Sequence, residues 1–313
     1  MLKKEIGSPI NNATNIVLGI DERFIRGASV CIASATHNST NGICAHIMYG
    51  RKEIPHHVIT HLEYLVENTD KLCIKLYTID DFASDFLVTE SITSAMYYRY
   101  GIGELLYGVV NRAIYLDADI VVDCNLDELY QIDMQGKWLG AVEDYVPDTS
   151  IPNDIRMKEF YDGLYFNSGV LLIDVNAWKE HRVFAQAIEK TKEVGHKLKH
   201  YDQDVLNIIF ANQWVELDHK WNCVSFKQEL TPHVVAHYLG SFKPWTAWYI
   251  DESVGLYDKY EALTLFSGTQ KQLPHRYNVK DAKYFKRFLW RKKDYINALK
   301  WEAIYMMWKL FKH

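Results

Sequence analysis

The chain has 313 residues, 48% of them hydrophobic and 24% charged, which is typical of a globular protein with one large domain or two modest ones. This composition excludes a disordered, collagen-like or coiled-coil chain. The net charge of −5 is unevenly distributed, because residues 280–313 contain ten Lys or Arg against three Asp or Glu. That segment therefore carries +7 and the preceding residues carry −12, so we predict an acidic body followed by a basic tail.

Short apolar runs alternate with helical periodicity along the chain. Strands are predicted at residues 16–20, 45–49 and 73–78, with helices between them at residues 27–39 and 57–67. This order is typical of an α/β protein with a mostly parallel sheet. Beyond it, we predict helices at residues 91–107 and 202–210 and strands at residues 112–116, 138–142 and 169–175.

Neither a secretory signal peptide nor a transmembrane helix is predicted. Polar residues interrupt the stretch that follows Lys3 and Lys4, so no apolar signal core forms there. The five cysteines are odd in number and form no C-x-x-C pair, which favours a reduced, cytosolic chain. Any membrane contact is therefore expected to be peripheral.

Two aspartates, Asp117 and Asp119, follow the strand predicted at residues 112–116. In extended backbone, side chains two residues apart point to the same face, and two facing carboxylates favour a cation between them. Chance alone gives about 1.5 such triplets in this chain. The second triplet is Asp202 to Asp204, where Asp204 is read as a charge at a helix N-terminus. The triplet from Asp117 to Asp119 lies at the carboxyl end of a strand, which favours a metal site there; the alternative is that the two aspartates are an incidental pair.

A second cluster combines His237, Gly240 and Lys243, followed by Pro244 and Trp245. Gly240 permits close approach of the backbone to a ligand, and Lys243 offers a point charge for phosphate. Pro244 and Trp245 stiffen the loop that holds both. Two carboxylates and one imidazole favour Mn²⁺ over Mg²⁺, which prefers oxygen ligands, and over Zn²⁺, which prefers more nitrogen or sulfur.

These two clusters and several other short motifs, in this order, resemble glycosyltransferase family 8, whose members have the GT-A fold. Within the family, the resemblance is strongest to bacterial lipopolysaccharide core galactosyltransferases and glucosyltransferases. It implies an α/β, Rossmann-like fold with a mostly parallel central sheet flanked by helices. The motifs that carry it lie at residues 16–21, 97–99, 115–119, 140–144, 165–169, 201–204 and 237–245.

The resemblance implies a binding site for a UDP-sugar. Asp117, Asp119 and His237 would hold Mn²⁺, with Mg²⁺ as a substitute, and Gly240 and Lys243 would contact the diphosphate. Asp21 would lie beside the uracil or ribose, although position 23, a small polar nucleotide contact in some relatives, is Arg23 here. The residues that would surround the transferred sugar are Arg99, Asp144, Asn167, Ser168, Asp202 and Gln203.

The family retains the anomeric configuration, and two routes are compatible with retention. A double displacement needs a nucleophile, for which Asp202 is chemically more plausible than the Gln203 amide. In a front-face route, the metal and Lys243 stabilise the departing UDP while the acceptor hydroxyl attacks on the same side. We favour the front-face route, with Lys243 as the group that acts on the leaving diphosphate.

The tail, residues 280–313, combines its basic residues with nine aromatic ones. Such a mixture also suits nucleic acids, but it fits better an interfacial helix on anionic lipid. We therefore divide the chain into a transferase domain, residues 1–279, and a membrane-associating tail, residues 280–313. The expected location is the cytoplasmic face of the inner membrane, with no nucleic-acid partner.

The predicted function is transfer of a hexose from UDP-glucose or UDP-galactose to a lipid-linked lipopolysaccharide core oligosaccharide. One alternative is a family 8 transferase that acts on a protein or on a glycogen primer. Another is a non-catalytic sugar-nucleotide-binding module, which broken metal ligands would indicate; Asp117, Asp119 and His237 are all intact.

Overall fold

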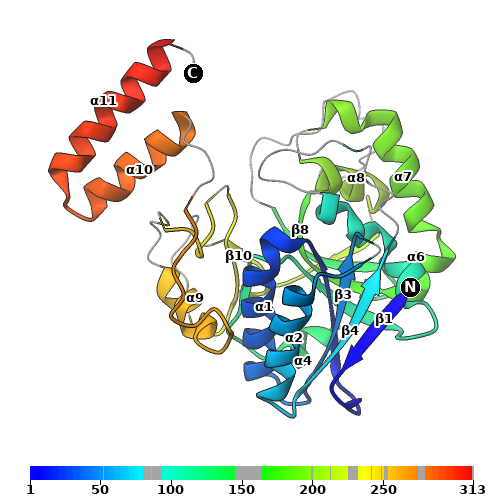
Figure 1. Ribbon diagram of the computed structural model, residues 1–313. Coiled ribbons are helices and arrows are strands. Elements are labelled where there is room, and N and C mark those ends of the chain that lie inside the picture. The colour runs from blue at the N-terminus through cyan, green and yellow to red at the C-terminus, as the bar shows by residue number, and fades with distance from the viewer. Residues whose placement is uncertain are drawn as a thin grey trace.

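The computed structural model describes residues 1–51, 53–79, 86, 94–144, 164–198, 200–211, 213–224, 232–240, 242–247, 249, 253–273 and 279–311. Within these residues, a central sheet has eight strands in the order β1-β4-β3-β2-β5-β8-β7-β9 (Figure 1). The strands are β1 Leu2–Ile6, β2 Thr14–Ile20, β3 Ile43–Tyr49, β4 Leu72–Thr78, β5 Arg112–Leu116, β7 Leu139–Glu143, β8 Phe166–Asp174 and β9 Trp214–Glu216.

Most neighbouring strands of this sheet run parallel. β2 pairs in parallel with β3 and β5, β3 with β4, and β7 with β9. β8 lies antiparallel between β5 and β7, and β1 lies antiparallel on the edge beside β4. The predicted α/β architecture with a mostly parallel sheet is confirmed, and β1 and β8 are its antiparallel members.

Helices cover both faces of the sheet, so its central strands are apolar on both sides. In β2, Ile16, Leu18 and Ile20 pack into the core beneath α1 and α2, whereas Val17 packs into the core that includes residues of α6, α7 and α8. This pattern explains why the strands read as continuous apolar runs. The helices are α1 Ile25–Asn38, α2 His56–Glu67, α3 Ile102–Leu106, α4 Leu126–Tyr130, α6 Val175–Glu180, α7 Val183–Val194, α8 Tyr201–Ile209 and α9 Val254–Glu261.

One predicted helix is α-helical only in its last part. Of the helix expected at residues 91–107, residues 91–93 lie outside the described part, and the rest forms the 3₁₀ helix η2, Ser94–Gly101, followed by the short α3. Tyr97, Arg99 and Tyr100 are all buried in η2. These tertiary contacts override the local α-helical pattern.

A second, smaller sheet joins distant parts of the chain. Its strands are β6 Ile120–Val122, β10 Cys223–Val224 and β11 Val235–His237, in the order β10-β11-β6. β11 runs antiparallel to β6, and His237 is the partner of Ile120. This pairing places the predicted histidine beside the predicted aspartates.

The tail folds as two helices, α10 Val279–Arg291 and α11 Tyr295–Phe311, which form a hairpin to one side of the sheet (Figure 1). Phe285 packs edge-on against Trp301 at 4.8 Å between ring centroids, and Lys286 pairs with Glu302 at 2.5 Å. None of the described helices is both long enough and apolar enough to span a membrane.

Candidate functional site

The two aspartates lie in the turn that links the two sheets. The Asp117 N–H donates to the Gly169 carbonyl of β8 at 2.9 Å, and the Ile120 N–H closes the turn on the Asp117 carbonyl at 3.2 Å. The expectation of extended backbone at this pair is therefore wrong. The carboxylates converge because the chain reverses here, not because strand residues alternate.

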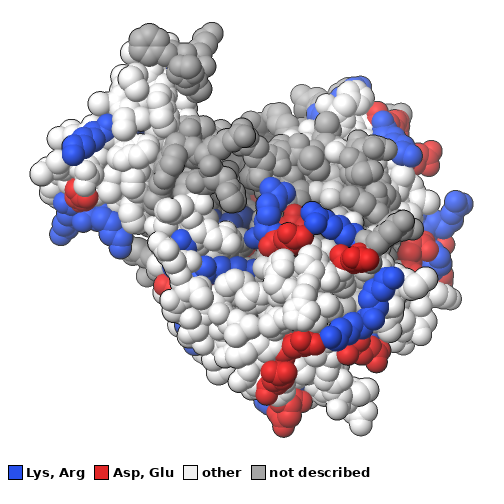
Figure 2. All heavy atoms as spheres, in the orientation of Figure 1, with Lys and Arg blue, Asp and Glu red and all other residues white. Residues whose placement is uncertain are grey.

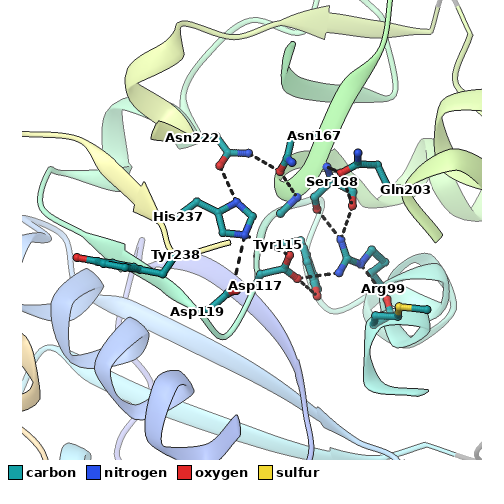
Figure 3. Close-up of polar contacts among 12 residues, drawn as sticks. Arg99, Tyr115, Asp117, Asp119, Asn167, Ser168, Gln203, Asn222, His237 and Tyr238 are labelled. Atoms are coloured by element: carbon teal, nitrogen blue, oxygen red, sulfur yellow. Dashed lines mark hydrogen bonds and ion pairs between the residues drawn. The ribbon is translucent and has the colours of Figure 1, made fainter. Parts of the chain in front are cut away.

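His237 reaches the same point from the other side. The β11–β6 pairing continues beyond the strand, because the Tyr238 N–H donates to the Asp119 carbonyl at 3.0 Å. The His237 Nε2 atom lies 3.3 Å from Asp119 Oδ1 and 3.8 Å from Asp117 Oδ2 (Figure 3). The three predicted metal ligands therefore meet, although about 120 residues separate them in sequence.

These three side chains fit a divalent cation. One ligand atom from each lies within 4.8 Å of the others. The Nε2 atom of His237 is buried and makes no hydrogen bond to any described residue, so its ring nitrogen is available to a metal. Gly169 makes room for the ring: a Cβ there would lie 2.2 Å from His237 Cε1.

Lys243 places its ammonium beside the same carboxylates. Its Nζ atom donates to Asp119 Oδ2 at 2.5 Å and to the Tyr238 carbonyl at 3.0 Å. Burial alone would raise the pKa of Asp119, but Lys243 and His237 outweigh burial and lower that pKa. Gly240, between His237 and Lys243, has a φ of 102° and is exposed, so the loop turns through backbone that favours glycine.

Arg99 links the aspartate turn to the opposite wall of the site. Its buried guanidinium donates to Asp117 Oδ1 at 2.7 Å and to the Ser168 carbonyl and hydroxyl at 2.6 and 2.8 Å. Its Nε atom lies 3.0 Å from Asp202 Oδ2. Tyr115 lies under the guanidinium, 4.4 Å from ring centroid to Cζ, and donates its hydroxyl hydrogen to Asp117 Oδ1 at 2.8 Å. Arg99 therefore hydrogen-bonds to Asp117 and forms an ion pair with Asp202, while its Nε atom donates to the Met96 carbonyl at 2.9 Å.

A set of amides and carboxylates forms the rest of this wall. Asp144 Oδ2 accepts from Asn167 Nδ2 at 3.3 Å and from Gln203 Nε2 at 3.2 Å. Gln203 Oε1 accepts the Ser168 N–H at 3.0 Å. Every polar atom of the Gln203 amide is thus engaged within the wall, so this side chain is held in place.

The Asp202 carboxyl is buried, and its Oδ2 atom makes no hydrogen bond to any described residue. Burial raises the pKa of Asp202 to about 7, although Arg99 opposes the shift. Asp204 accepts from Tyr165 Oη at 2.6 Å and from the His200 N–H at 2.8 Å. It supports the start of α8, as its reading as a helix N-terminal charge predicts.

Asp21 makes local contacts at the end of β2. Its side chain accepts the Arg23 N–H at 2.9 Å, and one carboxylate oxygen lies 3.5 Å from Arg23 Nε. The other predicted site residues all lie in the connected cluster described above, except Gly240, which is in the loop beside it. The assignment of Asp21 to a uracil or ribose contact stays a prediction.

Sequence reasoning missed four residues that contact the predicted site residues: Tyr115 beside Asp117, Tyr165 beside Gln203, and Gly169 and Asn222 beside His237. Three of them lie within the quoted motifs but were given no role. Asn222 follows the 3₁₀ helix η4, His219–Trp221, where no pattern in the sequence distinguishes it from an ordinary loop asparagine.

The raised pKa of Asp202 makes stability depend on pH. Between the ordinary value of 3.8 and about 7, the folded protein holds a proton that the unfolded chain has released, so stability falls as the pH rises. Asp202→Asn removes this contribution, so the variant should gain stability relative to wild type across that range, by up to about 1.4 kcal/mol per pH unit. Urea unfolding of both proteins at pH 4.5 and pH 7 measures the difference. If the unfolding free energy of both proteins changed equally between the two pH values, the raised pKa of Asp202 would be contradicted.

Comparison with known proteins gives the family of the chain. A family model described as glycosyl transferase family 8 matches residues 15–249. A lipopolysaccharide 1,2-glucosyltransferase of Escherichia coli is 30% identical over 256 residues, which cover 75% of this chain and 74% of that protein. A lipopolysaccharide 1,3-galactosyltransferase of Salmonella typhimurium is 28% identical over 256 residues, 75% of this chain and 73% of that protein.

Longer relatives share only part of their length with this chain. A probable glycosyl transferase Gly of Streptococcus gordonii is 35% identical over 163 residues, which are 49% of this chain but 22% of that protein. Among solved structures, the galactosyltransferase LgtC in complex with donor and acceptor sugar analogues superposes with a TM-score of 0.68 at 23% identity, over 84% of this chain and 98% of LgtC. That likeness confirms the GT-A fold. Because the family model matches most of the chain, the protein belongs to glycosyl transferase family 8 and is a glycosyltransferase.

Proposed function

We propose that this protein is a metal-dependent, retaining transferase that moves glucose or galactose from a UDP-sugar to a lipopolysaccharide core oligosaccharide. The observation that carries the proposal is the convergence of Asp117, Asp119 and His237 beside two cationic side chains, Lys243 and Arg99. The names of the Escherichia coli and Salmonella typhimurium relatives support the acceptor class and leave glucose and galactose both open.

The cation we propose is Mn²⁺, with Mg²⁺ as a substitute, because an imidazole joins two carboxylates in the ligand set. Bound there, the ion supplies Lewis-acid stabilisation of the leaving diphosphate. Lys243 contributes a second positive charge from the loop at residues 237–245, where the exposed Gly240 leaves space for phosphate oxygens.

The wall opposite the metal ligands is suited to a sugar. Carboxylate and amide groups of Asp144, Asn167 and Gln203 present both donors and acceptors to hydroxyl groups. Arg99 and Ser168 join them on the side of the aspartate turn. Asp21 is proposed to contact the nucleoside from the end of β2.

Retention is proposed to follow the front-face route. The bond from C1 of the hexose to the phosphate oxygen breaks, the acceptor oxygen bonds to C1 on the same face, and the acceptor proton passes to the departing phosphate. Asp202 suits a nucleophile poorly, because its carboxyl pairs with Arg99 and its pKa is about 7. We assign Asp202 and Gln203 to holding the sugar and Lys243 to the leaving diphosphate.

The tail is proposed to hold the enzyme at the cytoplasmic face of the inner membrane, with the division of the chain at residues 279 and 280. Several of its aromatic side chains are used within the hairpin, as the Phe285–Trp301 contact illustrates. Its exposed large apolar side chains include Trp290, Tyr295 and Met307 and, along α11, a stripe at heptad spacing. The stripe comprises Ile296, Leu299, Met306 and Leu310, which are 73%, 59%, 49% and 75% exposed.

Basic side chains accompany this stripe. Arg291, Lys292 and Lys293 are exposed where α10 joins α11, and Figure 2 shows basic residues at that end of the hairpin. An apolar stripe beside basic residues is suited to anionic lipid, where each Lys or Arg near the surface adds about 1 kcal/mol.

The direct test is transfer from UDP-glucose and UDP-galactose to a deacylated core acceptor, followed by mass spectrometry. Transfer should require Mn²⁺, and Asp119→Asn should lower turnover by about 10³-fold or more, because metal stabilisation of the leaving group contributes several kcal/mol. Asp133→Asn, at an exposed turn, is the matched control and should behave like wild type. Undiminished turnover in excess EDTA would refute the proposed metal dependence.

Lys243→Ala should lower turnover by about 10² or more with a smaller effect on donor binding, because its contact with the diphosphate strengthens as UDP departs. Steady-state kinetics with the preferred donor measures this. Lys179→Ala, which removes an exposed lysine paired with Glu104, is the control. A Lys243→Ala rate within a few-fold of the control would assign the role to another group.

For the tail, the double variant Ile296→Glu/Leu310→Glu should reduce binding to anionic vesicles by about tenfold or more, because it replaces two apolar side chains on the lipid-facing stripe. Co-sedimentation with anionic and neutral vesicles at low and high salt measures binding. Leu263→Glu changes an exposed leucine outside the tail and serves as the control. Equal binding of variant and control, or binding indifferent to lipid charge, would refute the membrane role.

A further inference from the structure

Asn222 is a buried asparagine that the proposed reaction does not use. It lies between η4 and β10, and 2% of its surface is exposed. Its Oδ1 atom lies 2.9 Å from His237 Nδ1, and its Nδ2 atom donates to Asn167 Oδ1 at 2.8 Å (Figure 3). The side chain therefore connects a proposed metal ligand to a residue of the sugar wall.

The direction of this hydrogen-bond chain is fixed by groups that have only one role. The Gly169 backbone N–H donates to Asn167 Oδ1 at 2.9 Å. At its other end, the Asn167 amide donates from Nδ2 to the Asp144 carboxylate at 3.3 Å. Because a backbone N–H is always a donor, the Asn167 atom that accepts from Gly169 must be the oxygen, and this same atom faces Asn222.

The orientation of Asn222 follows from that of Asn167. An oxygen of Asn167 requires the NH₂ group of Asn222 opposite it, which turns the Asn222 oxygen toward His237. The Nδ1 atom of His237 must then carry the hydrogen, since the Asn222 oxygen only accepts. In the neutral ring, Nε2 is left as the bare nitrogen, and it is this atom that faces Asp117 and Asp119.

We propose that Asn222 is a positioning residue that holds His237 in the Nδ1–H tautomer, with Nε2 directed at the metal site. The inference rests on the metal site of the proposed function. Gly169 and Asn222 fix the ring together: the missing Cβ of Gly169 accommodates its face, and the Asn222 oxygen sets its rotation. Such outer hydrogen bonds orient a ligand and raise its basicity.

Two substitutions at residue 222 separate the parts of this role. Asn222→Leu is similar in size but removes the acceptor for His237 and the donor to Asn167. Asn222→Asp keeps an acceptor for the Nδ1 hydrogen, but its second carboxylate oxygen replaces the donor and faces the Asn167 oxygen. If Asn222 acts through the imidazole, aspartate should rescue metal binding and leucine should not.

The first measurement needs no variant. In protein labelled with ¹⁵N-histidine and free of metal, the ring nitrogens of His237 at pH 8, assigned by their loss in His237→Gln, should report the Nδ1–H tautomer. Asn222→Asp should keep this tautomer, and Asn222→Leu should populate the Nε2–H form. A wild-type His237 in the Nε2–H form would overturn the inference.

The second measurement is titration with Mn²⁺ alone, in which electron paramagnetic resonance counts the free ion. Asn222→Leu should weaken Mn²⁺ binding by about 10- to 100-fold, and Asn222→Asp should stay within a few-fold of wild type. Asn15→Leu is the matched control, because the Asn15 amide likewise contacts a buried histidine ring, with Oδ1 3.1 Å from His46 Nε2, and donates to Tyr130 Oη at 2.9 Å, away from the site. It should lower stability without changing Mn²⁺ affinity.

Negative results in the two measurements refute different hypotheses. Wild-type affinity in a folded Asn222→Leu variant would overturn the role of Asn222 while leaving the metal site intact. Absence of Mn²⁺ binding by wild-type protein would refute the proposed metal. In that case the tautomer measured in the metal-free protein would still decide whether Asn222 sets the ring.

Discussion

The pairing of β11 with β6 is the constraint on which the site depends. Each strand has three residues, and their register sets His237 opposite Ile120, one residue beyond Asp119. The Asp119 carbonyl then accepts the Tyr238 N–H. This backbone hydrogen bond joins the turn that carries the two aspartates to the start of the loop that carries Lys243. A shift by one residue would turn His237 to the other face of the small sheet and separate the three metal-ligating side chains.

Charge balance explains why so many ionisable groups lie together in a buried place. Asp117, Asp119 and Asp202 would repel one another if they were desolvated alone. Arg99 lies between Asp117 and Asp202, and Lys243 pairs with Asp119. Burial raises the pKa of Asp202 by more than Arg99 lowers it, and the nearby Asp117 adds to the rise, whereas at Asp119 the effect of burial is outweighed by Lys243 and His237, which lower the pKa.

The sequence is informative where a residue type and its neighbours imply one chemistry. Asp117, Asp119, His237 and Lys243 could be chosen in this way, and the structure brings all four together. The strands beside them were predictable because both faces of the sheet are apolar. The turn between Asp117 and Ile120 was not, because it is formed by a hydrogen bond within the turn and by a contact with the Gly169 carbonyl about 50 residues away.

Asn222 marks the limit of sequence reasoning more sharply. Its importance comes from two partners, Asn167 and His237, that lie 55 and 15 residues away, and neither spacing has a local signature. The same holds for Gly169, since a glycine at a strand position indicates close approach without naming the group that approaches. The roles of Asn222 and Gly169 can be recognised only from the structure, which shows the His237 ring in contact with both.

Among the described residues, an aromatic contact links the tail to the loop that carries Lys243. Phe242, which precedes Lys243, stacks on Tyr284 of α10 with 3.8 Å between ring centroids and 13° between ring planes. The hairpin therefore packs against the loop that carries the lysine. Displacing α10 would either break this stack or move the residue next to Lys243, so deletion of the tail would remove part of the support of the loop. Substitutions on the exposed stripe of α11 leave that support in place, and they therefore isolate lipid contact from the chemistry of the site.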